Sequence, residues 1–185
     1  KDQRLFTNSG SASMGYDLPG AIGASVAIQN TQDIICFAGD GSIMMNLQEL
    51  QTIVTNKLRV KIVIFNNQGY LSIKQTHDNF FNGVLVGCNP SSGVEFPSFK
   101  KISNAFEIPY FSLLNHDNID DKIIEFLSYN GVALLEVFID PNQSFEPKSA
   151  SMRLEDGSMV SRPLEDLAPF LDRDELKLNM LVPMI

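Results

Sequence analysis

The sequence contains few of the residues that build disulfide frameworks or positively charged surfaces. It has no tryptophan, two cysteines and two histidines in 185 residues, and its 14 lysines and arginines compare with 22 aspartates and glutamates, a net charge of −8. We expect Cys36 in a buried strand and Cys88 in a loop, which excludes the disulfide framework of small secreted domains. The negative charge argues against nucleic acid or an anionic membrane as partners.

Long apolar segments are absent as well. No apolar run reaches the length of about 18 residues that a membrane span needs, and no signal-peptide pattern is present. We therefore expect a cytoplasmic protein that is neither exported nor inserted in a membrane. With 44% hydrophobic and 19% charged residues, the composition is that of a globular protein.

What the sequence does contain is an alternation of apolar runs and helical segments. It predicts strands at residues 34–38, 61–65, 108–113 and 132–138, and helices at residues 19–29, 47–55, 97–106 and 117–129. The last strand is nearly all apolar, as is typical of a parallel strand covered on both faces. The alternation predicts an α/β fold with a three-layer, doubly wound parallel sheet.

Two short polar motifs follow neighbouring predicted strands. Gly39-Asp40-Gly41-Ser42 comes directly after the strand at residues 34–38, and Asn66-Asn67 comes directly after the strand at residues 61–65. Open α/β sheets bind ligands at the carboxyl ends of their strands. An isolated Gly-Asp-Gly is usually only a turn, but its pairing with Asn-Asn at this spacing favours a binding site.

The residue types fit a metal-bound diphosphate. Mg²⁺ prefers oxygen ligands from one or two carboxylates, with phosphate oxygens and water completing the octahedron. Asp40 offers a carboxylate and Asn67 an amide oxygen, while Gly39 and Gly41 allow close approach of the backbone. Ser42 and the following amides lie where a helix would begin, and helix starts favour anions.

These motifs resemble the diphosphate-binding (PP) domain of thiamine-diphosphate enzymes, whose signature is Gly-Asp-Gly, a spacer, and Asn-Asn. Here residues 42–65 form the spacer. Residues 11–24, with the sequence SASMGYDLPGAIGA, resemble the segment that precedes this signature in acetolactate synthase and its relatives. The resemblance covers residues 8–140 and is closest to the acetolactate synthase-like branch. It implies the thiamine-diphosphate-binding fold.

The resemblance also implies a set of ligands. Mg²⁺ would be coordinated by Asp40, by the side chain of Asn67 and by the carbonyl of Gly69. Gly41 and Ser42 would hold diphosphate oxygens through their amides and the serine hydroxyl. The full set of implied cofactor-binding residues is Ala12, Met14, Gly39, Asp40, Gly41, Ser42, Met45, Asn67, Gly69 and Tyr70.

Three of these residues would contact the rings of the cofactor rather than its diphosphate. Met45 stands where the family places a bulky apolar residue under the cofactor, and Ala12 and Met14 would offer a backbone carbonyl and amide to the aminopyrimidine. The alternative for Met14 and Met45 is ordinary core packing, because methionine readily fills irregular gaps.

The activity that the resemblance implies is decarboxylation of a 2-keto acid, followed by protonation of the carbanion or its ligation to an acceptor. In this family a glutamate from the pyrimidine-binding (PYR) domain, normally on a partner subunit, activates the cofactor. No segment of this chain resembles that domain. We therefore expect a homodimer or homotetramer that completes its site between subunits, and a fragment that is inactive alone.

The chain begins without methionine, and we expect it to be the carboxyl-terminal third of a larger enzyme; a separately encoded subunit is the alternative. We assign residues 1–150 to the PP domain and residues 151–185 to a tail with a short helix at residues 172–178. The tail is expected to act either as an active-site lid or as a subunit contact. Residues 162–166 resemble synthase-like proteins of surface-sugar biosynthesis, which suggests a sugar or aldehyde acceptor.

Residues 68–92 would wall the active site in the family and so help to choose the substrate. Candidate substrate-facing residues are Gln75, His77, Phe80 and Phe81, and His77 is the single candidate for proton transfer in this chain. A solvent-exposed histidine is the alternative. In acetolactate synthases the corresponding segment contains a Gln-Trp pair. The lack of tryptophan in this chain argues against acetolactate synthesis and against FAD.

Two other functions compete with this interpretation. A non-catalytic module for thiamine-diphosphate binding or assembly is opposed by the intact metal ligands. A nucleotide-binding domain is opposed by the absence of both glycine-rich phosphate-binding patterns. We expect Asp40 to lie in a loop outside the core, so that Asp40→Ala removes Mg²⁺-dependent cofactor binding and leaves the fold intact.

Overall fold

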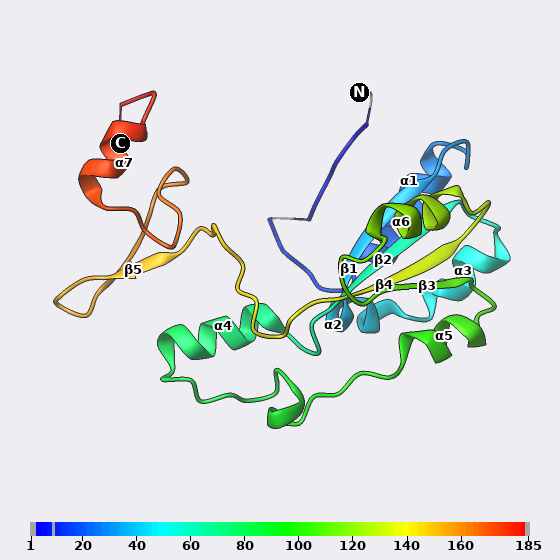
Figure 1. Ribbon diagram of the computed structural model, residues 1–185, viewed down its shortest axis with the longest axis horizontal. Coiled ribbons are helices and arrows are strands. Elements are labelled where there is room, and N and C mark those ends of the chain that lie inside the picture. Colours follow the sequence, from blue (N-terminus) through cyan, green and yellow to red (C-terminus); the bar gives the residue numbers. More distant parts are fainter. Residues whose placement is uncertain (1–2, 9, 184–185) are drawn as a thin grey trace. The chain divides into compact units, whose positions relative to one another are not determined.

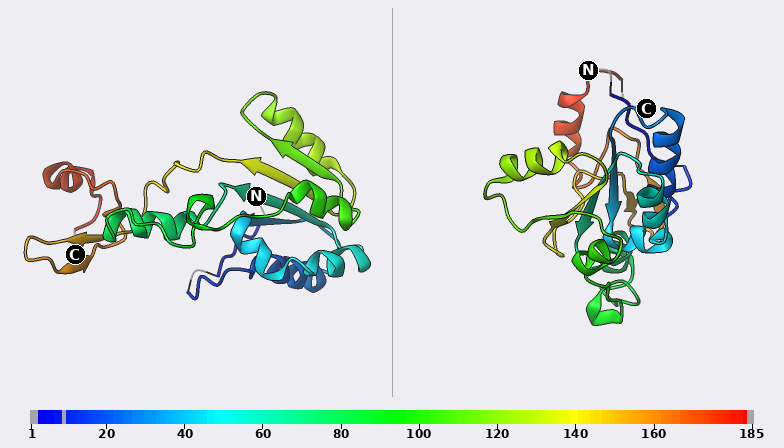
Figure 2. Two further views of the ribbon diagram at one scale, coloured as in Figure 1. Left: turned by 90° about the horizontal axis from the view of Figure 1, so that it is seen from below. Right: turned by 90° about the vertical axis from the view of Figure 1, so that its right-hand side faces the viewer.

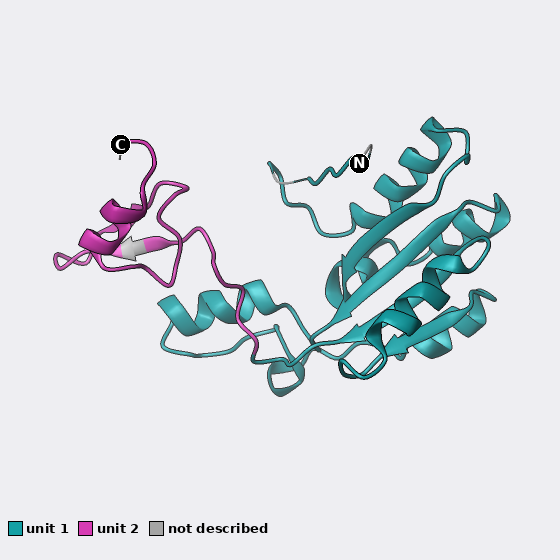
Figure 3. Ribbon diagram, turned by 45° about the horizontal axis from the view of Figure 1, so that its top comes forward, with its two compact units in different colours: residues 1–142 teal, residues 143–185 magenta. Residues whose placement is uncertain are grey.

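A computed structural model describes residues 3–8 and 10–183, apart from the side chain of Met152. The chain forms two compact units, residues 1–142 and residues 143–185 (Figure 3). The first unit holds both predicted motifs.

The first unit is built on a four-stranded sheet in which all neighbouring strands are parallel. The strand order is β1 (Ile34–Gly39), β2 (Val60–Asn66), β4 (Ala133–Phe138) and β3 (Tyr110–Leu113) (Figure 1). Every predicted strand is present, with its ends within two residues of the prediction. The predicted parallel α/β sheet is therefore confirmed.

Helices lie on both faces of this sheet. In the left view of Figure 2, α6 lies on one side of the strands and α1 on the other. The four predicted helices correspond to α1 (Asp17–Ala27), α3 (Glu49–Thr55), α5 (Phe99–Ala105) and α6 (Ile119–Ser128). Four further short elements are α2 (Asp40–Ile43), η1 (Met44–Asn46), α4 (Leu71–Phe80) and η2 (Pro90–Ser92).

Two clusters of buried residues form the core, one on each face of the sheet. The larger cluster joins the sheet to α1, α3 and α5, and its residues include Leu18, Leu50, Ile53, Ile62, Ile64 and Phe99. The smaller cluster joins β3 and β4 to α6 and contains Val63, Leu113, Phe126, Ala133 and Leu135. These two clusters confirm the three-layer arrangement.

The second face of the sheet is only partly covered. Over β1 and the end of β2, the side chains of Ile35, Phe37 and Phe65 are 45%, 56% and 36% exposed. The rings of Phe37 and Phe65 stack with their centroids 5.9 Å apart. Among the described residues, β1 is also an edge strand that pairs only with β2. This exposed apolar surface is called the β1–β2 face below.

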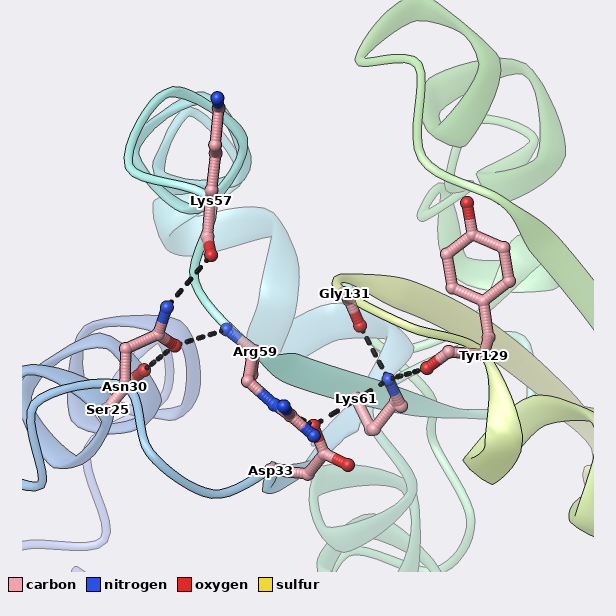
Figure 4. Close-up of polar contacts among 8 residues, drawn as sticks. All are labelled: Ser25, Asn30, Asp33, Lys57, Arg59, Lys61, Tyr129 and Gly131. Atoms are coloured by element: carbon pink, nitrogen blue, oxygen red, sulfur yellow. Dashed lines mark hydrogen bonds and ion pairs between the residues drawn. The ribbon is translucent and has the colours of Figure 1, made fainter.

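A buried lysine holds the amino end of the sheet together (Figure 4). The Nζ of Lys61 is fully buried and donates to the carbonyls of Tyr129 at 2.6 Å and Gly131 at 2.5 Å, at the end of α6. Its Nζ is also 4.0 Å from the carboxylate of Asp33, which pairs with Arg59. Burial lowers the pKa of Lys61 and the charge of Asp33 opposes that shift. The ammonium thus ties β2 to the loop before β4.

The second unit contains a hairpin and a helix. Its strands β5 (Ser151–Arg153) and β6 (Met159–Ser161) pair antiparallel, and α7 (Arg173–Asn179) confirms the last predicted helix. The unit is organised by Asp166, which is 1% exposed and accepts hydrogen bonds from Arg162 Nε at 2.5 Å and Arg173 Nη1 at 2.6 Å. Arg162 and Asp166 are the first and last residues of the segment 162–166, whose resemblance suggests a sugar or aldehyde acceptor. In the structure their side chains bond to each other and stabilise the fold of the tail.

Within the part of the chain that the structure describes, no helix is both long and apolar enough to cross a membrane.

Candidate functional site

The two predicted motifs meet at the carboxyl edge of the sheet. Strands β1 and β2 run parallel with Gly39 opposite Phe65, so Asp40 and Asn67 both follow the ends of adjacent strands. The two segments are in direct contact, because the amide of Gly69, two residues after Asn67, donates to the carboxylate of Asp40 at 3.1 Å. The sequence prediction that both motifs share one edge of the sheet is confirmed.

Asp40 is buried rather than exposed in a loop. It is the first residue of α2, is 1% exposed, and accepts a second hydrogen bond from the amide of Gly41 at 2.8 Å. The expectation that this carboxylate lies outside the core is therefore wrong. Burial raises the pKa of Asp40, whereas the backbone amides around it lower it. A cation beside the carboxylate would replace the solvation that burial removes.

Asn67 supplies the clearest sign that the site takes a ligand. Its Oδ1 is buried and has no hydrogen-bond partner among the described residues. A buried amide oxygen without a partner costs roughly 1–3 kcal/mol, and such an atom calls for an ion, a water or a ligand. A carboxylate and a free amide oxygen from adjacent strand ends are the donors that Mg²⁺ prefers. The residues present therefore fit the metal.

The backbone at Gly69 is closely confined. A Cβ atom on this residue would lie 2.3 Å from the carbonyl oxygen of Cys88. The same carbonyl accepts from the amide of Tyr70 at 2.7 Å. The preceding residue, Gln68, has a φ of 61°, which L-residues adopt only in left-handed turns. Only glycine at position 69 lets the turn pass beneath this carbonyl.

Gly41 has an equally close neighbour. A Cβ atom there would lie 2.3 Å from the ring of Tyr70, which packs edge-on against Phe96 with centroids 5.5 Å apart. Tyr70, predicted only as a cofactor-binding residue, is therefore also the wall against which the Asp40–Gly41 backbone rests.

The hydroxyl of Ser42 is already engaged within the protein. It donates to the carboxylate of Asp17 at 2.6 Å and accepts from the amide of Gly15 at 3.0 Å. Asn46 adds a hydrogen bond from its side chain to the carbonyl of Gly15 at 2.7 Å. These contacts join the segment before α1 to the Gly-Asp-Gly motif. Because the hydroxyl proton of Ser42 is donated to Asp17, the predicted contact of Ser42 with a diphosphate would have to come from its amide.

The predicted ring-contacting residues lie on the surface of the first unit. Met14 and Met45 are 50% and 47% exposed, so the alternative that they fill the core is wrong. The backbone of Ala12 is in the left-handed region, with a φ of 48°, and its amide donates to the carbonyl of Asn8 at 2.7 Å. A cleft of about 410 Å³ passes Ala12, Gly39 and Ser42 and continues over β1.

His77 is neither fully exposed nor free. It lies on α4, is partly buried, and packs edge-on against Phe81 with ring centroids 6.0 Å apart. Its Nδ1 accepts a long hydrogen bond of 3.4 Å from the amide of Val86. These contacts close the turn after α4, and a role in proton transfer stays a prediction.

Several residues that shape the site escaped sequence analysis. Cys88 was predicted as an unremarkable loop residue, yet it is fully buried and its carbonyl braces the Gly69 turn. Asp17 was not assigned a role, and its contact with Ser42, 25 residues away, has no local signal in the sequence. Glu136 was hidden in an apolar strand, where a lone carboxylate is itself a signal of a buried polar network.

Comparison with known proteins decides the family. The family described as "Thiamine pyrophosphate enzyme, C-terminal TPP binding domain" matches residues 1–137. The chain belongs to this family. The cofactor of these domains is thiamine pyrophosphate, the diphosphate for which the metal-binding residues were predicted.

Curated relatives with similar sequences are acetolactate synthase large subunits. The chain is 35% identical over 150 residues to the protein of Porphyra purpurea, which covers 81% of this chain and 25% of the relative. It is 33% identical over 147 residues to isozyme 2 of Escherichia coli strain K12, covering 80% of this chain and 26% of the relative. The chain thus spans about a quarter of the length of these relatives.

Solved structures contain the same fold. Benzoylformate decarboxylase from Polynucleobacter necessarius matches with a TM-score of 0.61 and 23% sequence identity, over 72% of this chain and 25% of that protein. The match supports the predicted α/β thiamine-diphosphate-binding fold.

Proposed function

We propose that this chain is the diphosphate- and Mg²⁺-binding part of a thiamine-diphosphate-dependent enzyme. The observation that carries the proposal is the buried, unpartnered Oδ1 of Asn67 beside the buried carboxylate of Asp40, at the carboxyl ends of adjacent parallel strands. In this proposal Asp40, Asn67 and the carbonyl of Gly69 hold Mg²⁺. The amides of Gly41 and Ser42 hold the diphosphate.

The remaining contacts would orient the cofactor. Met45 is exposed beside Gly15, whose added Cβ would lie 2.6 Å from the Cβ of Met45, so the position of this side chain is set by the backbone before α1. Met45 would support the rings of the cofactor, and the backbone of Ala12 and Met14 would bind the aminopyrimidine. Gly39 and Tyr70 would shape the floor on which the diphosphate rests.

The reaction we propose is decarboxylation of a 2-keto acid, with protonation of the product or its ligation to an acceptor. Thiamine diphosphate supplies the electron sink for such a decarboxylation. The proposal is supported by the similarity to acetolactate synthases and to the fold of a decarboxylase. It extends to either a lyase or a transferase. The prediction that FAD is not needed stays a prediction, based on the absence of tryptophan.

We propose further that a PYR domain of a partner subunit supplies the activating glutamate, and that the enzyme is a homodimer or homotetramer in the cytoplasm. The assignment of residues 1–150 to cofactor binding and of residues 151–185 to a lid or subunit contact also stays a proposal. The hairpin and α7 give the tail a fold of its own, which is compatible with either role.

The first test is calorimetric titration of the protein with thiamine diphosphate, with and without MgCl₂. We expect binding heat that depends on Mg²⁺ and that disappears in Asp40→Ala. Because Asp40 is buried and joins Gly41 to Gly69, this variant will also lose some stability, and its unfolding by urea must be followed in parallel.

The matched control is Glu125→Ala, which removes an exposed carboxylate from α6 on a helical position that favours alanine. It should bind the cofactor like the wild type. If folded Asp40→Ala binds thiamine diphosphate with unchanged affinity and unchanged Mg²⁺ dependence, the proposed metal site is wrong.

A further inference from the structure

A buried carboxyl group lies behind the metal-binding turn. Glu136 stands in the middle of β4, opposite Ile64 of β2, and is 4% exposed. One carboxyl oxygen accepts from the Asn66 amide group at 2.6 Å, and the other accepts from the Tyr110 hydroxyl at 2.5 Å. Both oxygens therefore have a partner, and the three side chains come from three neighbouring strands.

Asn66 continues this chain of hydrogen bonds into the turn. Its Oδ1 accepts from the amide of Gln68 at 3.0 Å, and its own carbonyl accepts from the amide of Ile139 at 2.9 Å. Gln68 is the residue with left-handed backbone, and Gly69 follows with its amide on Asp40. The side chain of Asn66 thus holds the turn that carries Asn67 and Gly69.

We propose that Glu136 is a positioning residue for the metal site: through Asn66 it fixes the turn that presents Asn67 and Gly69 beside Asp40. The inference rests on the proposed function, since it assigns to this turn the binding of Mg²⁺. Glu136 itself does not contact the metal. It decides which way the Asn66 side chain faces, because a carboxylate accepts hydrogen bonds only and so selects the amide nitrogen of Asn66.

Tyr110 donates a hydrogen bond to the second oxygen of the Glu136 carboxyl group. Burial, together with the bond to Glu136, raises the pKa of the Tyr110 hydroxyl, so the phenol stays protonated and remains a donor at neutral pH. Outer-shell partners of metal ligands commonly change metal affinity by roughly 10–100-fold when they are removed. The hydrogen-bonded side chains of Tyr110, Glu136 and Asn66, called the relay below, would be such partners of the turn that carries Asn67 and Gly69.

The relay can be tested by reversing its polarity in the full chain. Asn66→Asp breaks the relay, because it places two carboxylates against each other. Glu136→Gln alone keeps it, because the new amide oxygen can accept from Asn66 while the new amide nitrogen donates to the Tyr110 hydroxyl, which can also accept. In the double variant, the new amide at position 136 donates to the new carboxylate at position 66 and its oxygen still accepts from Tyr110. The new carboxylate still accepts from the amide of Gln68.

Two measurements follow each variant. Electron paramagnetic resonance of free Mn²⁺, used in place of Mg²⁺ with thiamine diphosphate present, gives the metal dissociation constant. Hydrogen–deuterium exchange without metal gives the protection of the Gln68 and Gly69 amides. We expect Asn66→Asp to bind Mn²⁺ about 10-fold more weakly and to exchange these amides faster. Glu136→Gln should stay near the wild type, and the double variant should return both values towards the wild type.

The matched control is Glu125→Gln, the same change at an exposed position of α6, which should alter neither value. Wild-type Mn²⁺ affinity and amide protection in Asn66→Asp would overturn the role of the contact between Glu136 and Asn66. Weak binding that the double variant does not restore would also overturn it, because a loss of stability alone predicts no rescue. Absence of Mn²⁺ binding by the wild type would instead overturn the proposed metal site.

Discussion

Gly69 is the point of the site where the backbone has the least room. A methyl group on this residue would meet the carbonyl oxygen of Cys88, a backbone atom that cannot swing away as a flexible side chain could. We expect Gly69→Ala to destabilise the protein by about 2 kcal/mol, the usual cost of overpacking, and to weaken Mg²⁺-dependent cofactor binding. Urea denaturation and calorimetric titration measure the two effects.

The control for this variant lies in the same motif region. Gly39 has a φ of −79°, which any residue adopts, and no atom within 4 Å of an added Cβ. Gly39→Ala should therefore keep wild-type stability. Equal loss of stability in both variants would show that the Cys88 carbonyl is not the constraint.

At the scale of elements, the second unit depends on one ion cluster. The bond from Arg173, followed by that from Arg162, holds the pKa of Asp166 below its usual value, against the effect of burial. A lowered folded-state pKa means that the stabilisation is present above the ordinary carboxyl pKa of about 4 and is lost as the pH falls through the folded value. The tail should loosen in acid.

Asp166→Asn should produce the same loosening at pH 7, because an amide cannot accept from two guanidinium groups with both of its polar atoms. Faster cleavage by trypsin within residues 143–185 would report it. Asp174→Asn, which removes an exposed carboxylate from the same unit, is the control. A tail in Asp166→Asn that resists trypsin like the wild type would contradict the role of the cluster.

Periodicity was enough to predict the elements of the sheet, but not the contacts around the site. The strands and the helices α1, α3, α5 and α6 have apolar patterns long enough to recognise, so their bounds came within two residues. The helix α2 has four residues and begins at the candidate metal ligand itself, too short for any period. The burial of Asp40 and Cys88 depends on segments far apart in sequence, and local pattern carries no signal of it.

At the scale of the whole molecule, the β1–β2 face is an apolar surface that includes β1, an edge strand with one unpaired side in the part of the chain that the structure describes. Such edges are prone to association unless they are covered. We expect the 185-residue chain to self-associate in solution, as measured by size-exclusion chromatography with light scattering. Phe37→Thr should reduce this association, because Phe37 is the most exposed of the three side chains and forms a stack with Phe65.

The comparison variant is Phe81→Thr, which removes a phenylalanine of nearly equal exposure, 58% against 56%, from outside the β1–β2 face. It should associate like the wild type. A chain that is monomeric at all concentrations, or an equal effect of both variants, would contradict association through this face.

The buried Lys61 has one further consequence. β2 begins next to this lysine and ends just before Asn67, the proposed metal ligand. The structural contact of this strand and its proposed binding contact therefore lie at opposite ends. Random mutagenesis should therefore separate two classes of loss along β2. Changes near Lys61 would lower the yield of folded protein, whereas a change at Asn67 itself, whose Oδ1 has no partner among the described residues, would spare yield and lower ligand affinity.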